Sequence, residues 1–153
     1  YFELMASQIP DSNKRPLSNN TRYNRLKEYM SLLGFASGNG SDYLLDPSQA
    51  IEEELPNIFQ NKKTLSSKEF IRGLADQIPI LDYGKYRIQI EDYLKEEVIK
   101  KPDQFQLSET LSFALRRLEL KRILEFEDKG DAKNKYKPWN ENFFKPFTHV
   151  NIL

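Results

Sequence analysis

One order of structural elements occurs twice along the chain: a basic helix, a strand, a polar turn that contains glycine, and a second strand. The first copy reads RYNRLKEYMSLLGFASGNGSDYLL, and the second reads TLSFALRRLELKRILEFEDKGDA and closes with FTHVNIL. The two copies match in the order of their elements and not in residue identity. Because an internal repeat constrains a fold more than any single motif does, we expect two consecutive units of one kind.

Helical periodicity and capping residues place the helices. Asn19, Asn20 or Thr21 can cap a helix that ends at Gly34. Its apolar residues recur at spacings of three and four, which predicts one apolar face made of Tyr23, Leu26, Met30 and Leu33. Further helices are predicted over 46–59, 66–78, 86–99 and 108–122. Ser66 or Ser67 is expected to cap the second of these, and Ser108 to start the last. Strands are predicted over 35–37, 42–45, 123–127 and 147–153, and a polar boundary over 61–70.

These elements predict a helix-rich α+β protein. With 153 residues, of which 39% are hydrophobic, the chain has room for one ordinary domain or two very small ones. The repeat divides it into a first unit over residues 1–62 and a second over 63–153. The chain opens on YFELMAS, which reads like the middle of a helix, so we expect a piece of a longer protein whose first unit lacks its opening helix.

The run from Arg25 to Phe35, RLKEYMSLLGF, carries a resemblance to the winged helix-turn-helix family. In that family a three-helix bundle precedes a β-hairpin wing, and the third helix commonly enters the major groove of DNA. The arrangement is similar to tandem winged-helix accessory proteins of bacterial anti-phage islands, such as the DpdG type. It also resembles the paired winged-helix subunits that clamp SMC ATPases. The resemblance covers most of the chain and implies two such units, each with a β-hairpin wing.

Charge and composition limit the classes of partner. Lys plus Arg equals Asp plus Glu at 23 each, whereas a compact DNA-binding protein is usually clearly basic. The chain has no cysteine and one histidine, which excludes thiolate sites and argues against a transition metal; we expect no cofactor. No apolar run reaches the length of a membrane span, so we expect a cytoplasmic protein.

Basic and amide side chains nonetheless gather where a DNA-reading helix would carry them. Arginine pairs with guanine, asparagine with adenine, and either basic side chain with phosphate. The DNA-binding candidates are Lys14, Arg15, Asn20, Arg22, Asn24, Arg25, Lys27, Arg116, Arg117, Lys133 and Lys135. The alternative for the helix of Arg22 and Arg25 is an ordinary solvated face.

The two predicted wings differ in charge. The first, Gly38-Asn39-Gly40, has no cation and is followed by Asp42, which argues against a grip on phosphate. The second interleaves aromatic residues with lysines, namely Lys129, Lys133, Lys135, Tyr136, Lys137 and Trp139. That mixture suits nucleic acid, and it equally suits a solvated loop whose rings pack onto the core.

Three other patterns are weaker. Pro102-Asp103 with Glu127-Asp128-Lys129 formally satisfies a Mg²⁺-nuclease signature, but Asp103 falls in a loop between helices where that chemistry needs adjacent strands. His149 is interpreted as structural. The run Glu52–Glu54 is interpreted as a helix-start feature, with an acidic partner site as its alternative.

Two functional hypotheses follow. In the first, a non-enzymatic module binds double-stranded DNA through residues 19–33, with Arg22 and Arg25 as the main readers, as a regulator or as an accessory subunit of a bacterial defence system. In the second, the same fold is a protein adaptor or clamp in a larger defence or SMC-like complex, or forms a homodimer. Basic residues gathered on one face favour the first hypothesis, and basic residues divided between faces favour the second.

Overall fold

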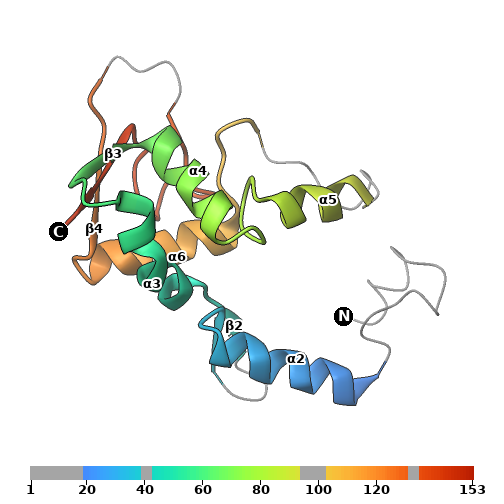
Figure 1. Ribbon diagram of the computed structural model, residues 1–153. Helices are drawn as coiled ribbons and strands as arrows, with labels where there is room; N and C mark the ends of the chain where they lie inside the picture. The colour runs from blue at the N-terminus through green and yellow to red at the C-terminus, as the bar shows by residue number, and fades with distance from the viewer. Residues whose placement is uncertain (1–18, 39–42, 94–102, 131–134) are drawn as a thin grey trace.

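The computed structural model describes residues 19–38, 43–93, 103–130 and 135–153, which form an α+β fold with two small antiparallel sheets (Figure 1). The helices in these residues are α2 (Asn20–Leu32), α3 (Ser48–Phe59), α4 (Ser67–Gln77), α5 (Lys85–Tyr93) and α6 (Glu109–Leu120). The strands are β1 (Ala36–Ser37), β2 (Leu44–Leu45), β3 (Thr64–Ser66), β4 (Leu124–Glu127) and β5 (His149–Ile152). The predicted α+β class is confirmed. None of the helices in the described residues is long and apolar enough to cross a membrane.

Helix α2 and the β1–β2 hairpin form an arm that leads away from the rest of the molecule (Figure 1). Asn19 caps α2, as predicted: its side chain accepts a hydrogen bond of 2.9 Å from the backbone of Arg22. Gly34 follows the helix with a φ of +72°, a conformation in which glycine avoids the strain of a side chain. The predicted hairpin is confirmed by the antiparallel pairing of Ala36 with Leu45.

The apolar face predicted for α2 is not buried. No residue of this helix is buried, and Leu26 and Leu33 remain 39% and 60% exposed. The helix packs against the small hairpin of its own arm and not against the core. Two short strands are too small to cover the apolar side of a helix, so the apolar face predicted for α2 stays largely exposed.

Helices α3, α4 and α6 supply most of the hydrophobic core. The predicted caps explain where two of them begin. Ser66 and Glu69 form a capping box at α4, and the Ser108 side chain accepts a hydrogen bond from the backbone of Leu111 at α6. The hydrogen bond from Ser66 lowers the pKa of Glu69. The largest fully buried side chains are Ile51, Leu55, Phe59, Phe70, Ile71, Leu74, Leu107, Leu111, Leu115, Leu118, Leu124 and Phe147.

The second sheet has the strand order β3-β5-β4, with both ladders antiparallel. Leu65, Phe126 and Val150 lie in one cross-strand row, in which Leu65 and Val150 are buried and Phe126 is half-buried. Strands β4 and β5 were predicted, and β3 was not. The segment that contains β3 was interpreted as a polar boundary, because a single apolar residue, Leu65, gives no visible alternation.

The turn between α4 and α5 is tied to the start of α6. Asp82 is buried and accepts a hydrogen bond from the backbone of Ser108, the residue that caps α6. Burial raises the pKa of the Asp82 carboxyl above its usual value, in spite of that hydrogen bond. Next to it, the Tyr83 hydroxyl donates to the carbonyl of Gln106 at 3.3 Å, and burial raises the pKa of Tyr83 to about 12. Helix α5 begins near the predicted position; its predicted end at 99 lies outside the described residues.

Both copies of the predicted element order are present, because β1 and β2 follow α2, and β4 and β5 follow α6. A tandem of two winged-helix units stays a prediction. The described part of the first copy holds one helix before its hairpin, and α3 belongs to the same hydrophobic cluster as α4 and α6. That cluster therefore crosses the division predicted between residues 62 and 63.

Candidate functional site

The N-terminal half of α2 presents an open, basic and polar surface. Asn20, Arg22, Asn24 and Arg25 are all exposed. Within the described part of the chain, no hydrogen bond or ion pair engages the guanidinium of Arg22 or Arg25. The first turn contains no acidic residue, so the positive end of the helix dipole has no carboxylate beside it.

Lys27 is held differently from the other basic residues of α2. Its ammonium lies 5.3 Å from the centre of the Tyr23 ring and 5.7 Å from that of Tyr43, and its carbonyl accepts a 3.4 Å hydrogen bond from the Tyr43 hydroxyl. Burial, followed by the neighbouring Tyr23, raises the pKa of Tyr43. Lys27 therefore fastens α2 to its hairpin, which leaves its side chain half-buried.

Both basic residues of α6, Arg116 and Arg117, form ion pairs with carboxylates. Arg117 forms an ion pair with Asp46, whose side chain is 4% exposed, and Arg116 forms one with Glu119. Just past the helix, Lys121 lies 2.8 Å from Glu52. The positive charge predicted to face DNA is therefore neutralised on this helix.

The acidic run Glu52–Glu54 lies further along α3 than predicted. The helix begins at Ser48 and has no acidic residue in its first turn. Glu52 pairs with Lys121, and Glu54 accepts a 2.7 Å hydrogen bond from Asn57. The helix-start interpretation of this run is wrong, because Asp46-Pro47-Ser48 starts the helix one turn earlier.

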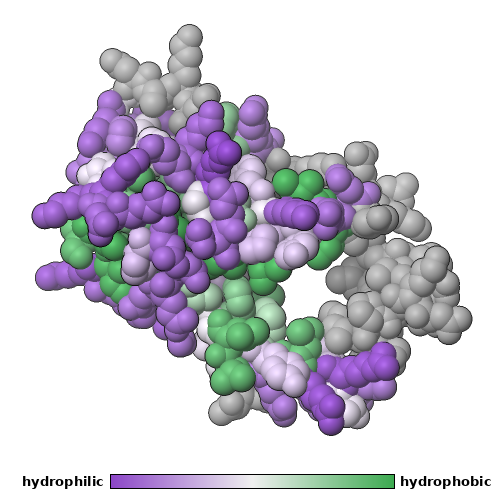
Figure 2. Space-filling view, viewed as in Figure 1, coloured by the Kyte–Doolittle hydropathy of each residue, from purple (hydrophilic) through white to green (hydrophobic). Residues whose placement is uncertain are grey.

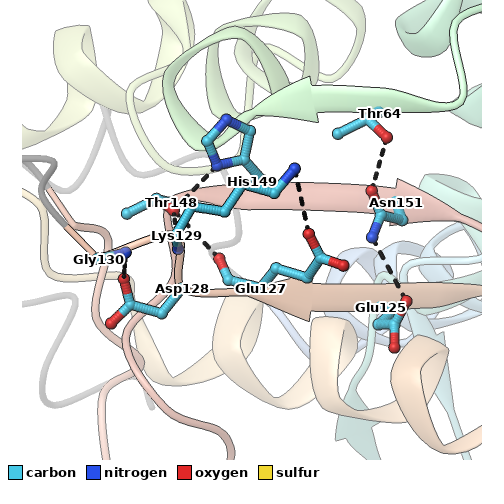
Figure 3. A network of polar contacts seen from close by, with 9 residues as sticks. All are labelled: Thr64, Glu125, Glu127, Asp128, Lys129, Gly130, Thr148, His149 and Asn151. Carbon is cyan, nitrogen blue, oxygen red and sulfur yellow. Dashed lines mark hydrogen bonds and ion pairs between the residues drawn. The ribbon is translucent and has the colours of Figure 1, made fainter.

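Two lysines of the β4–β5 connection also have carboxylate partners, and Figure 3 shows the first of them, Lys129. Lys129 lies 3.3 Å from Glu127, and Lys135 lies 2.7 Å from Asp128. Hydrogen bonds from Lys129 and then Asn151 lower the pKa of Glu127. Those from Lys135 and then the backbone of Gly130 lower the pKa of Asp128.

The sequence left two interpretations of the aromatic residues in this connection: contact with nucleic acid, or packing onto the core. Tyr136 is buried among Tyr83, Phe105 and Phe147, so it packs onto the core. Trp139 is 50% exposed. The candidates Lys14, Arg15 and Lys133 lie outside the described residues, as does the tip of the first predicted wing.

A polar row crosses the open face of the three-stranded sheet (Figure 3). Thr64 donates to Asn151 at 2.7 Å, and Asn151 donates to Glu125 at 3.4 Å, so that one side chain from each strand takes part. His149 lies 3.0 Å from the Thr148 hydroxyl through Nδ1 and is opposite Glu127 in the ladder. The polar side chains on this face of the sheet therefore bond one another, and the contact of His149 with Thr148 is consistent with a structural role for this histidine.

The nuclease-like pattern does not gather into a metal centre in the described residues. Asp103 is exposed before α6, whereas Glu127 and Asp128 lie at the end of β4 with lysine partners. No group of three or more His, Cys, Asp or Glu that could hold a metal ion occurs in the described parts of the chain. The absence of enzymatic activity remains a prediction.

The predicted DNA-binding residues are divided between two ends of the molecule. Figure 1 shows α2 at one end and the β4–β5 strands at the other, with α3, α4 and α6 between them. Arg22 and Arg25 thus do not share a face with Lys129 and Lys135. Basic residues that are divided between faces favour a protein partner, as stated from the sequence. The absence of ion pairs at Arg22 and Arg25 in the described residues favours DNA.

Sequence reasoning missed Asp46 as the residue that joins the arm to the body. Its backbone N–H donates to the Phe35 carbonyl at 2.9 Å, and its carboxylate accepts from the backbone of Ser48 at 3.1 Å and from Arg117. The run Asp46-Pro47-Ser48 signalled a helix start. The partner on α6 is 71 positions away in the sequence, and no local signal indicates it.

The family model described as DpdG-like matches residues 2–132, which is most of the chain. No curated protein and no solved structure matches the chain.

Proposed function

The chain belongs to the DpdG-like family, and from this membership we propose that it is a non-enzymatic accessory subunit of a bacterial defence system that binds double-stranded DNA through α2. Family membership fits the accessory role in a defence-associated system. The observation that supports DNA binding is the exposure of Arg22 and Arg25 in the first half of α2.

The position of these arginines suits a groove-reading helix. They lie in the first half of α2, and helices that enter the major groove contact base edges with their N-terminal residues. Asn20 and Asn24 are exposed on the same half and can pair with adenine. The helix projects from the body formed by α3, α4 and α6, so none of the described helices and strands of that body covers it (Figure 1).

The winged-helix part of the proposal is carried by α3, α4 and α6. They share one hydrophobic cluster and are followed by the hairpin of β4 and β5, which is the bundle-then-wing order of that family, with α5 as an insertion. Since Arg116 and Arg117 are paired with carboxylates, α6 serves in this proposal as a structural helix. The DNA-reading role passes to α2.

A protein adaptor is the second candidate. It is favoured by the ion pairs that neutralise Arg116 and Arg117 on α6, and Lys129 and Lys135 in the β4–β5 connection. It is also favoured by the exposed apolar residues of the arm, which exceed what a DNA-reading helix needs.

Fluorescence anisotropy of labelled random duplex DNA, titrated with protein at several salt concentrations, tests the DNA proposal. We expect micromolar binding near 50 mM salt that weakens as salt rises, because phosphate contacts release counterions. Arg22→Ala/Arg25→Ala should lower the slope of log K against log salt by about 2, one unit for each lost contact.

The matched control is Lys68→Ala/Arg72→Ala, which removes the same charge from exposed positions on α4. It should bind as the wild type does. The proposal fails if wild-type protein does not bind DNA at ~50 mM salt, where such contacts are strongest. Equal losses in the two double variants would also refute it, because binding would then follow net charge and not α2.

A further inference from the structure

The arm exposes six large apolar residues. Figure 2 shows hydrophobic surface gathered over the hairpin region, between the hydrophilic body and the hydrophilic end of α2. The residues concerned are 39% to 77% exposed: Leu26, Tyr29, Leu32, Leu33, Leu44 and Leu45. A helix of 13 residues that buries none of them is marginal in water on its own, so a surface that covers it would stabilise it.

Four of these residues form what we term the leucine face of α2: Leu26, Tyr29, Leu32 and Leu33. Spacings of three and four residues put them on one side of the helix. Tyr43 of the hairpin meets α2 at Lys27, two positions before Tyr29 and so about 200° around the helix from it. The leucine face is therefore turned away from its own hairpin.

A complementary surface lies on the same chain, where the hairpin of the arm meets α6. A groove of about 470 Å³ runs between β2 and the first turns of α6, and we term it the hairpin groove. Its lining is mostly apolar: Leu44, Leu45, Glu109, Thr110, Phe113 and Phe143. Phe113 and Phe143 meet edge to face, with ring centres 6.5 Å apart.

We propose that the leucine face of one copy packs into the hairpin groove of a second copy, and the reverse, to form a two-fold dimer. The two surfaces occur on one chain and are both apolar, but the leucine face points away from its own hairpin. Reciprocal contact satisfies both surfaces at once, which is the requirement for a closed two-fold interface.

The exposed area matches what such a dimer needs. If a fully exposed large apolar side chain presents about 120 Å², the six residues offer roughly 400 Å² per copy. Two copies would bury roughly 800 Å² of apolar area, and apolar atoms make up about 60% of a typical interface. The whole interface would then reach roughly 1,300 Å², within the range of stable specific complexes.

The inference does not depend on DNA binding. Arg22 lies one turn before Leu26 and Arg25 one turn before Tyr29, so the two arginines border the leucine face without belonging to it. Arg22→Ala/Arg25→Ala removes charge and leaves every residue of the leucine face and of the hairpin groove in place. It should therefore dimerise as the wild type does, so the two proposals can fail separately.

Sedimentation velocity over a concentration series tests the dimer. The wild type should pass from monomer to dimer, and Leu32→Glu on the leucine face or Leu44→Glu in the groove should each raise the dissociation constant at least about tenfold. Ile90→Glu on α5, at a residue 56% exposed, is the matched control and should behave as the wild type. Circular dichroism of each variant separates loss of the dimer from loss of the fold.

The chain has no cysteine, so a crosslink locates the contact. A mixture of Leu32→Cys and Leu44→Cys proteins, one carrying a tag, should form the mixed disulfide on oxidation, while Ile90→Cys mixed with Leu44→Cys should not. The proposal is overturned if the wild type stays monomeric up to ~500 µM, because specific interfaces of this size associate much more tightly than that. A Leu32→Glu protein that dimerises normally, or an Ile90→Glu protein that does not, also overturns it.

Discussion

Replacing Asp46 tests whether one buried carboxylate holds the arm to the body. Its carboxylate accepts hydrogen bonds from the first turn of α3 and from Arg117 on α6, and its backbone bonds the hairpin at Phe35. Loss of a helix-capping acceptor costs about 1 kcal/mol, and loss of a hydrogen bond to a charged group about 1.5–3 kcal/mol. Arg117 is 41% exposed, so water solvates its charge after the change and the larger penalty for an orphaned buried charge does not apply.

We therefore expect Asp46→Ala to lower the free energy of unfolding by about 3 kcal/mol. Asp46→Asn keeps an acceptor for the helix start and a neutral hydrogen bond for Arg117, so it should lower it by about 1.5 kcal/mol. Urea unfolding followed by circular dichroism at pH 7 measures both values.

A double-mutant cycle with Arg117→Ala should give a coupling energy of about 1–2 kcal/mol between the two side chains. Asp76→Ala is the control, because Asp76 is exposed and lies 4.0 Å from its partner Arg72; it should change stability by less than about 0.5 kcal/mol. If Asp46→Ala costs no more than Asp76→Ala, or if the cycle shows no coupling, the reasoning about this junction is refuted.

Two further changes probe the backbone and the pH dependence. Gly34→Ala places a Cβ 3.0 Å from the backbone nitrogen of Ala50 at a φ of +72°, so it should cost about 1–3 kcal/mol in urea unfolding; wild-type stability would contradict this. Burial raises the folded-state pKa of Asp82, so its contribution to stability is present below the unfolded value near 3.8 and is lost as pH rises through the folded value. Asp82→Asn removes this titration, and its stability relative to wild type should increase from pH 3 to pH 7 in urea unfolding; a constant difference would count against the burial argument.

Local signals carried most of the secondary structure. Asn19, Ser66 and Ser108 each cap the helix that follows them. Side-chain type and the apolar periodicity that comes next predicted all three, Asn19 and Ser66 as one of several neighbouring candidates. A cap needs only the three residues beyond it, so a single sequence is enough to find it. The hairpins were found for the same reason, since Gly38 and Gly130 supply positive φ at their turns.

Properties that depend on distant residues were missed. Strand β3 exists because β5 pairs with it, and Thr64–Ser66 alone has too little alternation to indicate a strand. The periodicity of α2 correctly predicted a helix, but burial of Leu26 and Leu33 requires a surface that the arm does not supply. The sequence marked Arg117 as a DNA contact because its type and position fit, and it could not show that Asp46 neutralises it.

The middle strand of the larger sheet has a consequence for the timing of folding. Thr64 in β3 bonds Asn151 in β5 across 87 positions of the sequence, and β4 also pairs with β5. At a synthesis rate of about 5–20 residues per second, the ribosome needs roughly 4–17 s to deliver β5 after β3. The three core helices can collapse in that interval. Until β5 is made, β3 and β4 have unpaired strand edges, and such edges promote aggregation. The helical part of the core is therefore expected to form first, and the sheet to close last around the strand that arrives at its centre.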